Sequence, residues 1–347
     1  MRTADLDYPL PDAAIAQHPI EPRDAARLLV DRGADRAVMH RHVRDLPDLL
    51  RAGDLLVVND TRVLPARLAL VRSTGGAVEV LLLAPVDDGH RRWEALVRPS
   101  RKLKVGERVH AAKDPAFVVE IGERIGDGAT RAVTLLADGD PIAALATHGE
   151  MPLPPYITAP LTDPERYQTV YAERPASAAA PTAGLHLTPE VLDRLEAGGI
   201  AMARVELVVG LDTFKPIAVD DPADHVIHTE SYRVEPEVLD RCRATRAAGG
   251  RVVAVGTTAV RALESAARRG PSGRTDLFIR RPYDWQVVDV LLTNFHLPRT
   301  TLLLLVDAFV GPRWRELYDI ALSDGYRFLS FGDAMLLERS TAVEVAP

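Results

Sequence analysis

Two patterns of apolar and polar positions follow one another along the chain. Between about residues 66 and 148, short apolar runs are separated by turns that contain glycine, such as STGG and GDG. Short strands joined by such turns are typical of a small antiparallel barrel or sandwich. From about residue 150 onward, runs that suit buried strands, such as RVVAVG at 251–256, alternate with helix-like runs, such as TTAVRALESAARRG at 257–270. This alternation predicts an α/β fold.

The position of the first pattern inside the second predicts an insertion. The chain has 347 residues, more than one hydrophobic core usually organises. A strand-like run, DLLVVND, already ends at residue 60. We therefore expect residues 1–65 and 149–347 to form an α/β main domain, a mixed sheet with helices. Residues 66–148 are expected to form an inserted small antiparallel β-barrel domain, and the proline-rich run at 149–157 a rigid connector back from it.

Composition excludes several classes of protein. The longest apolar run, TLLLLVDAFVG, is interrupted by Asp307, and the first residues lack a signal peptide's apolar core. We therefore expect no membrane partner and a cytoplasmic location. The single cysteine, Cys242, allows no internal disulfide, and HExxH is absent, so no metal site is expected. A net charge of −7 argues against coating nucleic acid through overall charge.

Polar residues follow three of the predicted strands. Loops at the carboxyl ends of strands in an α/β sheet can converge on one crevice. The free N–H groups of a helix that begins there can hold an anion or a ribose hydroxyl. The alternatives are capping by threonine, an ion pair of Asp60 with Arg62 or Arg67, and a structural role for a lone histidine. The residues concerned are Asn59, Asp60, Thr61 and Arg62; Gly256, Thr257 and Thr258; Asn294 and His296.

The run AAAPTAGLHLT at 178–188 surrounds one histidine, His186, with small residues. Such residues contribute little to a core, but they let the backbone come close to something else, either a substrate or another strand. Thr188, followed by proline, predicts a helix start directly after the run.

A local basic patch lies within RRWEALVRPSRKLK at 91–104. Its charge alone favours a solvated strand edge, where lysine and arginine discourage aggregation. Screening confines fields to about 10 Å at moderate salt, so a negative net charge leaves local nucleic-acid binding open.

Several long segments, in order, are similar to one known family. They include YPLPDAAIAQHPIEPRDAARLLV, LLVVNDTRVLPARL, MPLPPYI, ERYQTVYA, APTAGLHLT, VGLDTFKPI, GGRVVAVGTTAVRALE, VVDVLLTNFHLPRTTLLLLVDAFVG and YRFLSFGDAML. With these segments the chain resembles, nearly end to end, the S-adenosylmethionine:tRNA ribosyltransferase-isomerases of the queuosine pathway. The resemblance implies the same architecture, an α/β main domain with an inserted β-barrel.

The resemblance also implies a reaction. The ribosyl part of S-adenosylmethionine would pass to the aminomethyl group of a 7-deazaguanine base at the tRNA wobble position. It would rearrange to an epoxycyclopentane, giving epoxyqueuosine and releasing adenine and methionine. S-adenosylmethionine is then a substrate, with no bound cofactor, and the partner is the anticodon stem-loop of the tRNA.

Site residues follow as expectations from that reaction. A base must take a proton beside the sulfonium, and an acid would assist adenine departure. His186 is the leading acid/base candidate, with substrate binding or holding the turn as alternatives, and His296 is second. The carboxylates Asp60, Glu230, Glu264 and Asp333 could act as base or offset the sulfonium charge. The expected substrate-binding residues are Asn59, Thr61, Arg62, Pro181, Thr182, Gly184, Glu230, Gly256, Thr257, Thr258, Arg261, Glu264, Asn294 and Asp333.

The same resemblance changes the interpretation of the basic patch. Arg98, Arg101, Lys102 and Lys104 are now expected to hold the anticodon stem through its phosphates, with the wobble base extruded into the pocket. Further candidates are Arg23, Arg27, Arg313 and Arg315.

The chain departs from the family's pattern at six positions. Ala259 removes a hydroxyl from a candidate ligand loop, and Leu187 removes a ring that could stack on adenine. The full set is Leu187 for phenylalanine, Asp212 for glycine, Ala259 for serine, Arg281 for proline, and Leu329 and Phe331 for phenylalanine and tyrosine. These changes leave two alternatives: a divergent paralogue acting on another nucleoside or RNA, and a noncatalytic RNA-binding protein that retains the fold.

Overall fold

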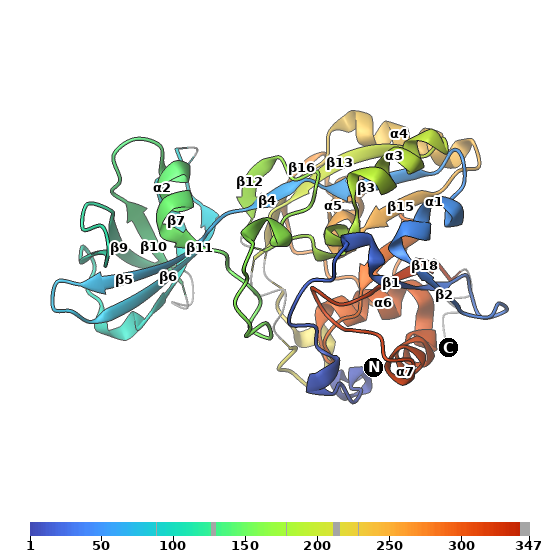
Figure 1. Cartoon of the computed structure of the whole chain (residues 1–347), viewed down its shortest axis with the longest axis horizontal. Coiled ribbons are helices and arrows are strands. Elements are labelled where there is room, and N and C mark those ends of the chain that lie inside the picture. The colour runs from blue at the N-terminus through green and yellow to red at the C-terminus, as the bar shows by residue number, and fades with distance from the viewer. Residues whose placement is uncertain (88, 126–129, 178, 211–215, 228, 341–347) are drawn as a thin grey trace. The chain divides into compact units, whose positions relative to one another are not determined.

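The chain forms two compact units in a computed structural model (Figure 1). The structure describes residues 1–340 except 88, 126–129, 178, 211–215 and 228. The main unit takes residues 1–61 and 155–173 and the chain from 181 onward, and the second unit takes residues 62–154 and 174–180.

The main unit is built on a mixed sheet, which has nine strands among the described residues. Four neighbouring strands, β13, β3, β15 and β17, run parallel, and β18 joins them antiparallel to β17. In spatial order the strands are β16 (Ser272–Thr275), β14 (Glu230–Arg233), β13 (Ala201–Leu207), β3 (Leu55–Asn59), β15 (Val252–Val255), β17 (Val290–Asn294), β18 (Ala334–Glu338), β1 (Arg27–Asp31) and β2 (Met39–His42). The predicted mixed sheet is confirmed.

Helices cover this sheet because its central strands are apolar on both faces. Every residue of β3, β15 and β17 is buried, as expected for parallel strands covered on both sides. One core cluster packs α1 (Leu46–Leu49) and α3 (Pro189–Ala197) against the sheet, while α5 (Gly256–Arg269) contacts β13, β3, β15 and β17. The remaining helices are α4 (Pro236–Ala247), α6 (Thr301–Val310) and α7 (Trp314–Ser323).

Helix boundaries follow the local signals in the sequence. The Thr188 side chain caps α3 by accepting from the Val191 N–H at 3.3 Å, and Pro189 occupies the first helical position. Gly256 begins α5 with a φ of 86°, a conformation that favours glycine, and no side chain caps this helix. The unsatisfied N–H groups of α5 therefore point out of the carboxyl end of β15.

The second unit is a closed antiparallel barrel. Its strands are β5 (Arg67–Arg72), β6 (Ala77–Pro85), β7 (Arg92–Arg98), β10 (Thr130–Leu135), β9 (Val118–Ile125) and β8 (Arg108–Ala111), in that spatial order, and β8 pairs back with β5. Alternate residues of β7 and β10 are buried, so one face of each fills the barrel. The unit also contains α2 (Pro141–His148).

The limits of the barrel unit differ from the expected 66–148. The strand β4 (Thr61–Val63), which leads into the barrel, pairs with β12 (Arg174–Ser177), which leads out, so residues 62–65 and 174–180 group with it. The start of the expected connector, β11 (Gly149–Glu150), pairs with β5. At Gly149 a side chain would overlap the Pro65 carbonyl, so this part of the chain is barrel sheet.

Candidate functional site

Polar side chains gather at the carboxyl edge of the parallel strands. Because β3, β15 and β17 are neighbours and run the same way, their ends meet. The short 3-10 helix η7 (Thr182–His186) lies against β17 and α5. The predicted residues brought to this edge are Asn59, Asp60, Thr61, Pro181, Thr182, Gly184, His186, Gly256, Thr257, Thr258 and Asn294, with Glu230 at the start of β14 and its partner Arg261.

A hydrogen-bonded chain of three side chains holds His186. The Thr182 hydroxyl donates to Asn294 Oδ1 at 2.8 Å, which directs the amide nitrogen of Asn294 toward His186 Nε2, 3.0 Å away. An amide nitrogen can only donate, so Nε2 accepts and the proton of the neutral imidazole lies on Nδ1.

His186 is buried and neutral. Burial, and then the charges of Arg327, Arg166 and Arg23, lower the pKa of His186 to about 3. With Nε2 engaged and Nδ1 protonated, the ring has no free lone pair for a proton. The geometry thus favours a role for His186 as a hydrogen-bond donor through Nδ1 over direct proton transfer. Either catalytic role of His186 stays a prediction.

Gly184 is glycine because Tyr171 occupies the adjacent space. A Cβ at Gly184 would overlap the Tyr171 hydroxyl and lie 3.0 Å from Thr169 Cγ2. Tyr171 is buried, and burial, followed by the Asp60 charge, raises its pKa. Of the two alternatives for the small residues, Gly184 thus fits close packing against another part of the protein. Its role in substrate binding stays a prediction.

We expect Gly184→Ala to destabilise the protein by about 1–3 kcal/mol, since the added methyl overpacks a filled site. Urea unfolding of the parental protein, Gly184→Ala and Gly184→Ala with Tyr171→Phe would measure this. Removing the tyrosine hydroxyl should restore part of the loss, and an equally stable Gly184→Ala protein would contradict this account of the glycine.

Several buried donors at this edge have no hydrogen-bond partner among the described residues. They are the Thr61 and Thr258 hydroxyls and Nε and Nη2 of Arg261. Arg261 pairs with Glu230 through Nη1 at 3.0 Å, and both side chains are more than nine-tenths buried. Since buried donors are normally satisfied, this set, together with the uncapped start of α5, favours a polar ligand.

Other predicted residues are engaged by the protein itself. The Asn59 side-chain amide donates to the Leu207 carbonyl and accepts from the Leu207 N–H. His296 shares a hydrogen bond with the Thr293 hydroxyl at 2.9 Å, and burial lowers its pKa to about 3. Its backbone bonds Tyr8 and Tyr318, which favours the structural alternative for His296.

Two of the predicted carboxylates bind backbone N–H groups. Glu264 is eight residues into α5, about 12 Å from its start, and accepts from the backbone of residues 286–288 and from Arg268. The structure therefore does not bring Glu264 to the strand ends. Asp333 accepts from the backbone N–H groups of Arg27 and Arg327, which ties the start of β1 to the turn before β18. Their roles in binding or catalysis remain predictions.

The departures from the family's pattern are largely buried. Leu187, Ala259, Leu329 and Phe331 are core residues, and Leu329 adopts a φ of 70°. Arg281 forms a two-pronged ion pair with Asp307, at 2.7 and 2.8 Å. Asp212 lies outside the described residues.

The basic patch belongs to the barrel unit. Arg98 ends β7, and Arg101 and Lys102 lie in the 3-10 helix η5 (Ser100–Lys102), with Lys104 just beyond. All four side chains are exposed. Arg62 also belongs to this unit. Their part in RNA binding stays a prediction.

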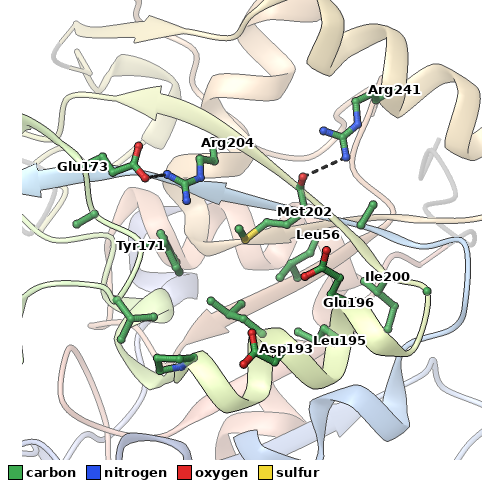
Figure 2. A pocket seen from close by; sticks show the side chains of 16 residues that line it. Leu56, Tyr171, Glu173, Asp193, Leu195, Glu196, Ile200, Met202, Arg204 and Arg241 are labelled. Atoms are coloured by element: carbon green, nitrogen blue, oxygen red, sulfur yellow. Dashed lines mark hydrogen bonds and ion pairs between the residues drawn. The ribbon is translucent and has the colours of Figure 1, made fainter.

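A pocket of about 740 Å³ lies beside α3 and β13 (Figure 2). Figure 2 shows Tyr171 in its wall, an ion pair of Glu173 with Arg204, and a hydrogen bond from Arg241 to the Met202 carbonyl. No predicted site residue lines it. Tyr171 thus separates this pocket from the Gly184 turn.

A smaller depression opens beside His186. Of its two arginines, Arg23 was a candidate for RNA binding and Arg166 was not predicted. Two of its lining residues are Arg23, in the 3-10 helix η3 (Arg23–Ala25), and Arg166, in η6 (Pro164–Tyr167). The charge of Arg327 also acts on His186. In the sequence, Arg166 stands in ERYQ, Arg23 in PRDA and Arg327 in YRFL. No local pattern connects these three segments.

Comparison with known proteins identifies the family. The model of the family described as "Queuosine biosynthesis protein" matches residues 3–337. The chain belongs to this family. A protein of Symbiobacterium thermophilum, named S-adenosylmethionine:tRNA ribosyltransferase-isomerase, is 50% identical over 344 residues, covering 97% of this chain and 100% of that protein. A protein of Thermus thermophilus with the same name is 50% identical over 341 residues, covering 95% of this chain and 98% of that protein.

A solved structure agrees with this membership of the queuosine biosynthesis family. The crystal structure of S-adenosylmethionine tRNA ribosyltransferase from Thermotoga maritima is 37% identical, with a TM-score of 0.55, and the match covers 96% of this chain and 99% of that one.

In the described ranges of our chain, no helix is long and apolar enough to cross a membrane.

Metal binding finds no support in the described residues. They contain no group of three or more histidine, cysteine, aspartate or glutamate side chains that could hold an ion. The absence of a metal or cofactor remains an expectation.

Proposed function

We propose that this protein transfers and isomerises the ribosyl moiety of S-adenosylmethionine onto 7-aminomethyl-7-deazaguanine at the wobble position of a tRNA. The product is epoxyqueuosine-tRNA, with adenine and methionine released. Membership of the queuosine biosynthesis family and about 50% identity to ribosyltransferase-isomerases support the activity.

One structural observation supports the location of the reaction. Buried donors of Thr61, Thr258 and Arg261 without partners in the described structure gather at the strand ends that also carry Asn294, the partner of His186. A polar, partly anionic nucleoside substrate would satisfy them.

The residues suggest how the roles divide. The His186 ring has no free lone pair, so its Nδ1–H would donate to a purine nitrogen or ribose oxygen and assist adenine departure. Glu264 and Asp333 are engaged by backbone N–H groups. The carboxylate candidates for removing the proton beside the sulfonium are then Asp60, at the end of β3, and Glu230, which is paired with Arg261.

Adenine release tests the function directly. Release from S-adenosylmethionine would be followed by chromatography with tRNA bearing the 7-aminomethyl-7-deazaguanine base and with guanine-containing tRNA as the control. We expect release only with the modified tRNA. Binding of that tRNA without release would favour a noncatalytic RNA-binding protein, and release with another RNA alone would favour a divergent paralogue.

Neutralising the basic patch should weaken tRNA binding. We expect a variant with Arg101, Lys102 and Lys104 replaced by glutamine to bind modified tRNA less tightly and to show a less steep dependence of log K on log salt, by about 0.7–0.9 per lost phosphate contact. Filter binding between about 50 and 200 mM salt measures this slope. An unchanged slope would remove the patch from the interface.

A further inference from the structure

Two arginines from distant segments, Arg23 and Arg166, line the depression beside His186. A third, Arg327, lies next to it and donates to the carbonyl of His18, directly before the lining residue Pro19. Arg23 comes from η3, Arg166 from η6, and Arg327 from the turn that precedes β18. The depression is lined by Pro19, Ile20, Arg23, Arg166, Leu185, His186, Ser330 and Phe331. Its volume of about 10 Å³ is enough for one oxygen atom and far too small for a nucleobase. We call Arg23, Arg166 and Arg327 the arginine cluster.

The protein neutralises this cluster only in part. Arg166 pairs with the Glu21 carboxylate and donates to the Ile20 carbonyl at 2.7 Å. Arg23 gives its N–H groups to the carbonyls of residues 165, 168 and 185. Exposed Asp163 and Glu165 act on Arg23 as charges.

The guanidinium of Arg327 has hydrogen-bond donors that the described residues leave free for a ligand. Its Nη1 makes one long hydrogen bond, 3.3 Å, to the His18 carbonyl. Its Nη2 is buried and has no hydrogen-bond partner in the described part of the chain.

The positive charge of the cluster lowers the pKa values of Arg23 and His186. Burial and then the charge of Arg166 lower the pKa of Arg23. All three arginines act against a proton on His186. An anion in the depression would relieve both repulsions, because an opposite charge stabilises a guanidinium.

We propose that the arginine cluster binds a backbone phosphate of the tRNA beside the reacting nucleotide. This inference rests on the proposed function and adds to it the contact that positions the RNA at His186. Planar guanidiniums suit phosphate oxygens. S-adenosylmethionine also has a carboxylate, but its sulfonium and ammonium give it a net positive charge, which the cluster repels. The RNA is therefore the better source of the anion.

The contact between the arginine cluster and the phosphate fixes the position of the RNA along the protein and does not read its sequence. Phosphate contacts fix how a protein lies on a nucleic acid, and base contacts read it. A phosphate held by Arg327 and Arg23 places the adjoining nucleotide beside His186.

Arg327→Gln tests the inference with an anticodon stem-loop RNA that carries the modified base. We expect binding about tenfold weaker, a salt slope less steep by about 0.7–0.9, and an unchanged KM for S-adenosylmethionine. The matched control is Arg243→Gln, which removes an exposed arginine of α4 paired with Asp240; it should leave all three unchanged.

A neutral methylphosphonate link in the RNA provides a test that needs no change to the protein. Placed on either side of the wobble nucleotide, one such link should weaken binding to the parental protein and have little further effect on Arg327→Gln. If no link weakens binding to the parental protein, or if Arg327→Gln raises only the KM for S-adenosylmethionine, the proposal is wrong. A parental protein that releases no adenine would instead overturn the proposed function.

Discussion

His186→Ala is expected to lower kcat for adenine release about 100-fold, the usual effect of removing one well-placed hydrogen-bond donor from a transition state. The structure assigns the donor to Nδ1, because Asn294 donates to Nε2. His186→Asn carries an amide nitrogen near the position of Nδ1 and should recover a substantial part of the rate. Steady-state kinetics with modified tRNA, on variants shown to be folded by their Tm, measures this.

The comparison of the two variants separates the possible roles of His186. If the ring must transfer a proton, His186→Asn will be as slow as His186→Ala, since asparagine does not titrate. A parental rate in His186→Ala would remove the residue from the reaction altogether. Because the pKa of His186 is about 3, the pH–rate profile of the parental protein should show no titration of this ring between about pH 6 and 8.

The protein is expected to lose about 4 kcal/mol of stability between about pH 7 and pH 5. Burial lowers the pKa of His186 and of His296 to about 3, whereas an unfolded histidine titrates near about 6.5. Between about pH 3 and pH 6.5, these two histidines bind protons in the unfolded chain and stay neutral in the folded protein. Stability is therefore lost as the pH falls below about 6.5, by about 2 kcal/mol per histidine at pH 5.

Urea unfolding at the two pH values, followed by tryptophan fluorescence, measures this loss. His296→Gln should reduce it to about 2 kcal/mol, because one buried histidine remains. The carboxylates with lowered pKa values, such as Asp54 beside Arg251, lose their contribution only at more acidic pH. The same pH dependence in His296→Gln and the parental protein would show that His296 is not the origin.

The fold was predictable where local patterns and topology agree. The runs at 55–59, 252–255 and 290–294 are apolar without alternation, as parallel strands buried on both faces require. Polar residues directly after such strands had to meet at one edge. The barrel followed from short strands and glycine turns.

The rest depended on contacts between distant segments. Nothing near Gly184 in the sequence shows that Tyr171 fills the space beside it. Glu264 has the same helical surroundings whether it faces a ligand or the backbone at 286–288. The arginine cluster likewise comes from three segments whose proximity only the fold establishes.

The pairing of β4 with β12 has a consequence for how such a chain can evolve. The segments that enter and leave the barrel unit lie side by side, so the insertion begins and ends at nearly one point. Its length and loops can change without pulling the nine-stranded sheet apart. An ancestor without the barrel would need only a short hairpin at the same position, and later lineages can reshape the barrel while the strand ends with His186 stay as they are.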